Sequence, residues 1–119
     1  MVIITHKWRN LEDHEFLSYR IPLSNVEAKR LTRKLSKHYN IQAPILKFNK
    51  KRNIKRTASA NYKEFIVRLP HNPDAELVCH EIAHLIVKKG HCKTWYETLK
   101  ELLIYASKKN YWKTIEKIG

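Results

Sequence analysis

The sequence predicts an α+β protein: a backing helix, a small three-stranded sheet, a central helix that carries two histidines, a following helix, and a short C-terminal helix or tail. Two segments place capping residues before apolar residues at helical spacing, and a shorter run alternates apolar and polar residues as a strand does. Only two glycines and four prolines interrupt the 119 residues. A chain of this length supports one hydrophobic core, so we expect a single domain over residues 1–119.

The first expected element is a helix over residues 24–38. Ser24 and Glu27 form a capping box, in which each side chain bonds the backbone N–H of the other residue. Ala28, Leu31 and Leu35 follow at helical spacing and form one narrow apolar stripe. Residues 1–23 show no clear pattern apart from a small acidic cluster, made of Glu12, Asp13 and Glu15.

Two strands are expected next. Residues 45–48 form a short strand, and residues 49–56 form a basic turn region. Residues 62–69 alternate, with Phe65, Val67 and Leu69 on one face, and Pro70 ends this second strand.

Two longer helices complete the expected core. Asn72 caps the first, Pro73 occupies its first position, and the helix runs through residues 88–89 to stop at Gly90. The next begins within residues 91–94 and ends near residue 107. Its inner face is apolar: Trp95, Leu99, Leu102 and Ala106. Residues 111–118 form a last short helix.

Positive charge is concentrated in one third of the chain. The formal net charge is +13, and residues 28–63 contain no acidic residue but 12 of the 24 lysines and arginines. Such a stretch favours a nucleic acid or another polyanion as partner, while a solvated cationic face is the alternative.

Bulk features also bear on the environment of the protein. No run approaches the roughly 20 apolar residues that span a bilayer, so we expect no membrane association and a cytoplasmic location. Cys79 and Cys92 do not make a disulfide framework, and Cys79 is expected to be a buried small apolar residue.

The motif that carries chemistry is His80-Glu81-Ile82-Ala83-His84, the pattern H-E-x-x-H. A helix brings the two imidazoles to one face, where both can hold one Zn²⁺ ion. Glu81 lies just off that face and is expected to act as general base and acid toward a water molecule. Gly90 then turns the chain so that His91 can face the pair as a third ligand, with the Trp95 ring beside it.

Other residues compete for these roles. Rivals of His91 as third ligand are Glu97, Glu101 and Cys92. Candidates for a donor to the oxyanion are Tyr96, Tyr105, Tyr111 and His71. The histidines could also be ordinary hydrogen-bonded helix residues, and Glu81 a carboxylate paired with a lysine. No role is assigned to His6, His14 or His38.

The run from Asp74 to His84, followed by Gly90-His91 and Trp95, resembles the minigluzincins, a family of minimal zinc metallopeptidases, and also the SprT-like peptidases. The resemblance implies a catalytic core over residues 24–107, with zinc held by His80, His84 and His91. It also implies that residues 62–69 form the sheet edge on which an extended peptide substrate pairs. Substrate contacts would come from that strand: Tyr62, Glu64, Ile66 and Arg68.

The resemblance further implies latency, as in a zymogen, with residues 108–119 covering the cleft. The sequence therefore predicts a zinc endopeptidase that acts on a peptide or protein substrate. Two alternatives stay open. One is a basic nucleic-acid-binding module with a structural zinc, or a peptidase acting on nucleic-acid-bound proteins. The other is a regulatory subunit or pseudoenzyme that forms a homodimer through its C-terminal helix.

Overall fold

The computed structural model describes residues 3–49 and 58–109, with side chains from residue 8 onward. It confirms the α+β class. The described chain contains four helices, a short 3₁₀ helix and one mixed sheet. The helices are α1 (Ile3–Glu15), α2 (Asn25–His38), α3 (Ala75–Val87) and α4 (Lys93–Lys109), and the 3₁₀ helix is η1 (Leu17–Tyr19). The strands are β1 (Ile45–Phe48), β2 (Ser59–Asn61) and β3 (Ile66–Leu69).

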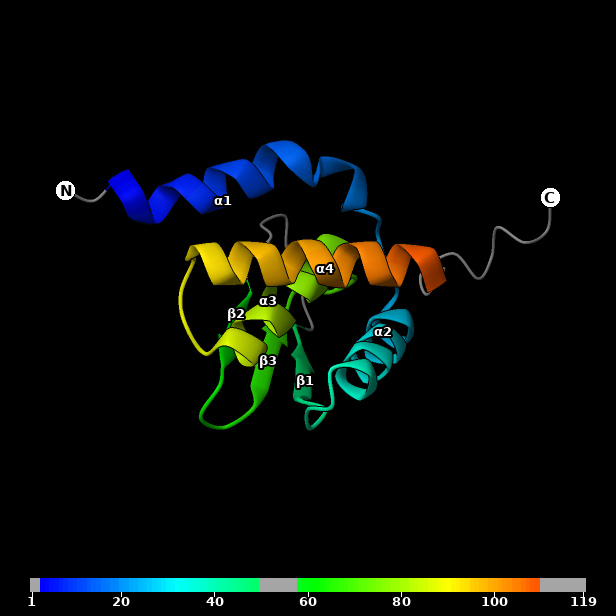
Figure 1. Ribbon diagram of the computed structural model, residues 1–119. Coiled ribbons are helices and arrows are strands. Elements are labelled where there is room, and N and C mark those ends of the chain that lie inside the picture. The colour runs from blue at the N-terminus through cyan, green and yellow to red at the C-terminus, as the bar shows by residue number, and fades with distance from the viewer. Residues whose placement is uncertain (1–2, 50–57, 110–119) are drawn as a thin grey trace.

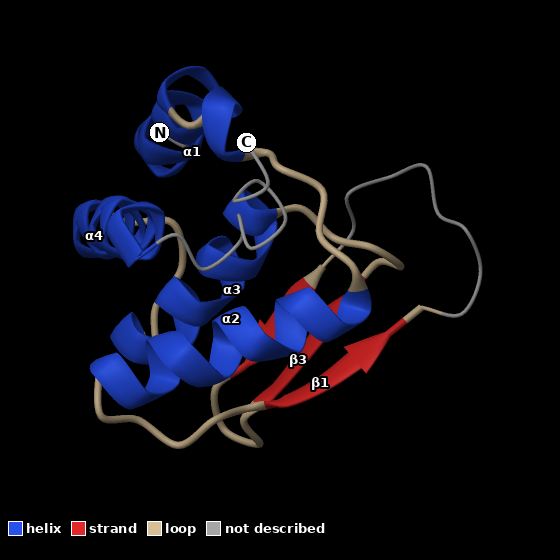
Figure 2. Ribbon diagram, turned by 90° about the vertical axis from the view of Figure 1, so that its right-hand side faces the viewer, coloured by secondary structure: helices blue, strands red, loops and turns tan. Residues whose placement is uncertain are grey.

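Helix α3 is the centre of the fold. It contacts α4 and α2 as well as β2 and β3. Helix α1 packs beside α4 (Figure 1), and α2 lies beside the sheet (Figure 2). A helix covered on several sides must be apolar nearly all round. This explains the composition of α3, whose buried apolar residues are Ala75, Leu77, Val78, Cys79, Ile82, Ala83 and Leu85.

The capping box of α2 is confirmed. Ser24 Oγ accepts a hydrogen bond from Glu27 N at 3.1 Å, and Glu27 Oε1 accepts one from Ser24 N at 2.8 Å. The predicted apolar stripe is fully buried. The apolar face of α4 is also as expected, because all four of its predicted residues are fully buried.

The sheet corrects the expected edge strand. Its order is β1-β3-β2, with β1 parallel and β2 antiparallel to β3, so β3 is the central strand. The predicted strand over 62–69 is also too long at its start. Asn61 Oδ1 accepts bonds from Lys63 N and Glu64 N, and Phe65 has φ 56°, so the chain turns before residue 66. The edge beside α3 is instead β2, which sequence analysis did not predict.

Both ends of α3 differ by about two residues from the prediction. Asp74, rather than Asn72, is the N-cap, because its Oδ1 accepts the Leu77 N–H at 2.8 Å. The helix ends at Val87, and Lys88 takes the left-handed conformation at φ 59° that Gly90 was expected to provide. The chain therefore leaves the helix axis earlier than predicted, which leaves room for the turn that carries His91.

Helix α1 was not predicted. It packs across α4, where the Trp8 ring lies 5.4 Å from the Tyr96 ring, and the Phe16 ring, directly after α1, lies 5.5 Å from it. A second attachment runs through Arg20, whose Nε donates to Glu76 Oε1 of α3 at 2.8 Å. In the described part of the chain, none of the helices has the length and apolar character needed to cross a membrane. The predicted helix over 111–118 and most of the segment 108–119 lie outside the described residues.

Candidate metal centre

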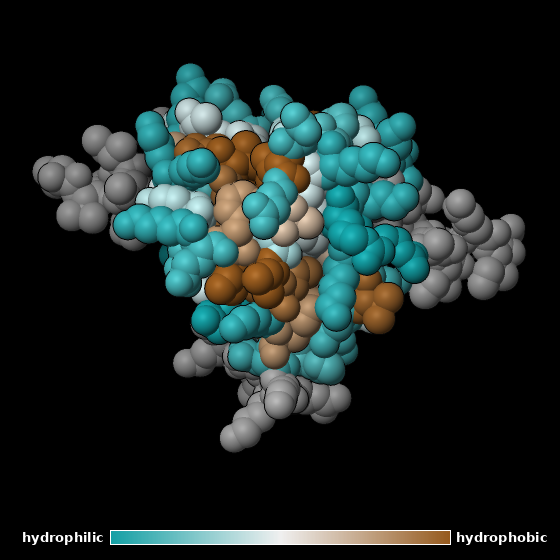
Figure 3. Space-filling model, turned by 90° about the horizontal axis from the view of Figure 1, so that it is seen from below, coloured by the Kyte–Doolittle hydropathy of each residue, from teal (hydrophilic) through white to brown (hydrophobic). Residues whose placement is uncertain are grey.

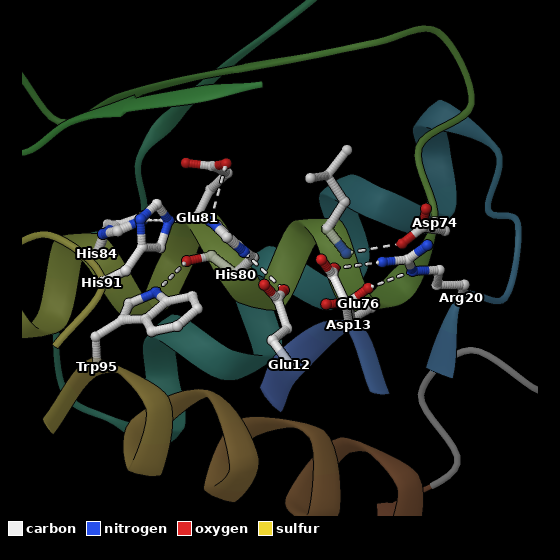
Figure 4. A network of polar contacts seen from close by, with 11 residues as sticks. Glu12, Asp13, Arg20, Asp74, Glu76, His80, Glu81, His84, His91 and Trp95 are labelled. Carbon is white, nitrogen blue, oxygen red and sulfur yellow. Dashed lines mark hydrogen bonds and ion pairs between the residues drawn. The ribbon is translucent and has the colours of Figure 1, made fainter. Parts of the chain in front are cut away.

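Three imidazoles converge at one end of α3. His80 and His84 project from the same face of the helix, and His91 enters from the turn that precedes α4 (Figure 4). The Nε2 atoms of His80 and His84 are 3.3 Å apart, those of His84 and His91 are 3.2 Å apart, and those of His91 and His80 are 3.1 Å apart. The spacing of four residues that sequence analysis used does place the first two histidines together, and the turn adds the third.

This triangle of nitrogen atoms fits a small tetrahedral metal ion. Three nitrogens bound at about 2.0–2.1 Å around such an ion are separated by about 3.3–3.4 Å. The observed separations lie within about 0.3 Å of that range. His80, His84 and His91 form one of the two groups of described residues that could hold a metal ion.

The opposite ring nitrogens have partners that orient two of these rings. His84 Nδ1 lies 2.8 Å from the carbonyl oxygen of Lys89. A carbonyl oxygen only accepts, so Nδ1 carries the proton and the Nε2 lone pair faces the other histidines. His80 Nδ1 lies 2.7 Å from Glu12 Oε2. Both contacts are of the kind that fixes the tautomer of metal-binding histidines.

The turn after α3 is what brings these groups together. Lys88 N donates to the His84 carbonyl oxygen at 2.8 Å, and its left-handed conformation reverses the chain. The next carbonyl, that of Lys89, then points back to His84, and His91 follows two residues later. Gly90 has no positive φ and no atoms close to where a Cβ would lie, so the reversal does not depend on it.

The Trp95 ring packs against all three histidines. Its side chain is fully buried, and its ring centroid lies 4.8 Å from His80, 5.4 Å from His84 and 4.6 Å from His91. Its Nε1–H donates to the His80 carbonyl oxygen at 3.3 Å. The expectation that this ring lies beside the site is confirmed. Its position keeps water away from the rear of the cluster.

Glu81 lies next to the face of α3 that carries His80 and His84. Its side chain is buried, and its Oε2 is 3.9 Å from His80 Nε2. Glu81 and the three histidines line one cleft of about 450 Å³. Helix α3 forms the middle of the cleft's lining. Helix α1 borders the cleft with Arg9, Glu12 and Asp13, and β2 borders it with Ser59 and Ala60. A carboxylate here can exchange protons with a small molecule that enters the cleft.

Burial also shapes the protonation of the site. Burial lowers the pKa of His84, and the nearby His80 lowers it further, while the Lys89 carbonyl acts in the opposite direction. A lowered pKa favours the neutral imidazole, which is the form that binds a metal. Burial likewise raises the pKa of the Cys79 thiol, and both cysteines are free, as expected.

Several predicted site residues lie elsewhere. Glu97 is exposed, and Glu101 accepts a bond from the Tyr39 hydroxyl, so neither joins the histidines. Tyr62 borders the cleft, but Glu64, Ile66 and Arg68 do not. Among the candidate oxyanion donors, Tyr96, Tyr105 and His71 do not line the cleft either, and Tyr111 lies outside the described residues.

Sequence analysis also missed residues that border the cleft: Arg9, Glu12, Ser59 and Lys89. Glu12 is the most informative of these, because it lies 68 positions from the histidine that it contacts. No local motif connects the two. The only available signal was helical spacing among Trp8, Leu11 and Glu12, which would have predicted α1 and the side of it that faces inward.

No protein-family model matches this chain, and comparisons with curated proteins and with solved structures find no match either.

Proposed function

We propose that this chain is a zinc-dependent metallopeptidase. The observation that carries the proposal is the convergence of the three Nε2 atoms at 3.1–3.3 Å beside the buried Glu81 carboxylate, at an open cleft. A purely structural zinc site is closed by four protein ligands and has no use for a carboxylate beside an open position. The resemblance to minigluzincins and SprT-like peptidases points the same way.

In this proposal each residue has one role. His80, His84 and His91 hold Zn²⁺. The ion supplies the chemistry of a Lewis acid, lowering the pKa of a coordinated water toward about 7 and polarising a carbonyl group. Glu81 accepts a proton from the attacking water and passes it to the leaving amine. Glu81 lines the cleft, and its burial screens the carboxylate from bulk solvent.

The sheet edge supports a peptide as the substrate. Within the described residues β2 pairs only with β3, and Ala58, Ser59 and Ala60 border the cleft. An extended peptide can add to such an edge by main-chain hydrogen bonds. In the proposal β2 therefore takes over the substrate-pairing role that sequence analysis gave to residues 62–69.

The proposal is tested with a mixture of unstructured peptides and zinc-loaded protein, both as the full chain and as the chain that ends at residue 107. Glu81→Gln should bind zinc like the wild type but lose cleavage, because the amide cannot accept the proton. Glu97→Gln removes the same charge at an exposed position, so this variant should cleave like the wild type. Cleavage by Glu81→Gln at the wild-type rate would refute the assigned role of Glu81.

Polyanion binding is a second candidate function, favoured by the charge of α2. Lys29, Arg33 and Lys37 are exposed on this helix, and within the described part of the chain none of them forms an ion pair. Lys29 and Arg33 also border a groove of about 260 Å³ beside β1. On the face of the molecule in Figure 3, hydrophilic side chains surround a hydrophobic centre. The affinity of a nucleic-acid strand that binds along α2 should fall steeply as the salt concentration rises. Absence of binding at low salt would eliminate this function.

Three further expectations belong to the same proposal. The peptidase is cytoplasmic, residues 108–119 hold it latent, and a homodimer forms through its C-terminal segment. A chain that ends at residue 107 should then cleave faster than the full chain and should be monomeric. Equal cleavage rates in the two forms would remove the latency, and a dimeric truncated form would remove this mode of dimerisation.

A further inference from the structure

Helix α1, which lies outside the H-E-x-x-H motif, places a carboxylate against one of the three clustered histidines. Glu12 is buried, with 3% of its side chain exposed, and its Oε2 lies 2.7 Å from His80 Nδ1. Figure 4 shows Glu12 entering from the side of α3 opposite Glu81. The corresponding nitrogen of His84 meets a neutral carbonyl instead. One of the two oriented histidines is therefore held by a charged group on a different element.

The rest of α1 and the residues that follow it, up to Arg20, are held on the molecule by further contacts. Trp8 and Phe16 pack on Tyr96 of α4, and Asp13 lies 2.9 Å from the Arg20 guanidinium, which in turn bonds Glu76 of α3. Glu12 is the point at which this attached helix meets a metal-binding residue. The docking of α1 and the orientation of His80 are therefore linked through the Glu12–His80 contact.

We propose that Glu12 is a positioning residue for the metal ligand His80, and that zinc binding and the docking of α1 are thermodynamically coupled through it. This inference rests on the zinc site of the proposed function. A carboxylate that accepts the Nδ1–H fixes the tautomer of the ring and makes Nε2 a better donor to the metal. Coupling is reciprocal, so zinc must favour the docked α1 by the same factor by which docked α1 favours zinc.

The affinity for Zn²⁺ alone, measured by competition with a chromophoric chelator, is the first test. Glu12→Gln should weaken zinc binding by about 10- to 100-fold, the usual effect of removing such a partner. Glu15→Gln removes the same charge three residues along α1 at an exposed position and should bind like the wild type. Trp8→Ala should also weaken zinc binding, because it removes the packing of α1 on Tyr96.

Two readouts separate positioning from a general loss of stability. The visible spectrum of the Co²⁺-substituted protein should change in Glu12→Gln and stay unchanged in Glu15→Gln, since only Glu12 contacts a ligand. Hydrogen exchange is the second readout. In the wild-type chain, Zn²⁺ should slow exchange of the α1 amides. In Glu12→Gln this slowing should be smaller, by the same factor by which the affinity for zinc falls.

The outcomes distinguish this inference from the proposed function. Wild-type chain that binds no zinc would overturn both. Wild-type chain that binds zinc, with Glu12→Gln equal to Glu15→Gln in affinity and in Co²⁺ spectrum, would overturn the coupling and leave the zinc site intact. Exchange in α1 that does not respond to zinc would also overturn the coupling.

Discussion

The ion pair between Arg20 and Glu76 gives a sharp test of how the N-terminal segment is held on α3. The Glu76 side chain is fully buried, whereas that of Arg20 is 28% exposed, and Arg20 Nε lies 2.8 Å from Glu76 Oε1. Replacing Arg20 by Met keeps an aliphatic stem of similar length but removes the guanidinium. Breaking a buried pair costs about 3–5 kcal/mol. Because Arg20 is partly exposed, we expect the lower end, about 3 kcal/mol.

Urea denaturation measures this loss as a lower midpoint at constant slope. For a chain of this size about 3 kcal/mol corresponds to a fall in Tm of roughly 12 °C. Asp13→Asn is the matched control, because Asp13 contacts the same guanidinium at 2.9 Å with 54% of its side chain exposed. Its cost should stay below about 1 kcal/mol. Equal losses in the two variants, or a loss below about 1 kcal/mol for Arg20→Met, would refute the reasoning.

Three other predictions concern stability. Lys88→Gly should raise the free energy of unfolding by about 0.5–1 kcal/mol in urea titrations, because Lys88 has φ 59°, while Lys89→Gly should bring no gain. Burial and the neighbouring Glu101 raise the pKa of Tyr39 to about 12, so the stability that Tyr39 contributes is lost as pH rises from 10 to about 12. Tyr39→Phe should remove this dependence from the pH profile of stability. Leu99→Ala should cost about 2–5 kcal/mol, measured by thermal melting, because Leu99 is fully buried, whereas the partly exposed Ile104→Ala should cost less than about 1 kcal/mol.

The parts of the fold that sequence analysis predicted carry local signals. The capping box at Ser24 and the apolar spacing of α2 and α4 depend on residues three or four positions apart, and such signals survive in any tertiary context. The candidate site was predicted for the same reason. His80 and His84 are one helical turn apart, and a turn of a few residues separates them from His91.

The parts that were missed depend on distant contacts. The order of the sheet follows from pairing between residues such as Ile45 and Ile66, which no local pattern encodes. Strand β2 has three residues, too few to show alternation. The contact of Glu12 with His80 joins α1 and α3 across 68 positions of sequence. Helix α1 itself had a local signal in Trp8 and Leu11, but the acidic cluster within it obscured the pattern.

The end of α3 shows how a tertiary demand shifts a boundary. Two lysines followed by glycine is a common helix end, and it predicted a stop at Gly90. The chain instead reverses at Lys88, where a lysine accepts a conformation that costs about 1–2 kcal/mol. The reversal places the Lys89 carbonyl on His84 and His91 beside the other two imidazoles. We attribute the left-handed conformation of Lys88 to the chain reversal that brings the three histidines together.

The most direct test of the central claim is the zinc content of the untagged wild-type chain, measured beside His91→Ala after identical dialysis. The proposal predicts one zinc ion per wild-type chain and a sharply lower content in His91→Ala, because this substitution removes one of the three nitrogens that converge at 3.1–3.3 Å. Wild-type chain that holds no zinc even after reconstitution, or equal zinc in both proteins, would contradict the proposed three-histidine centre.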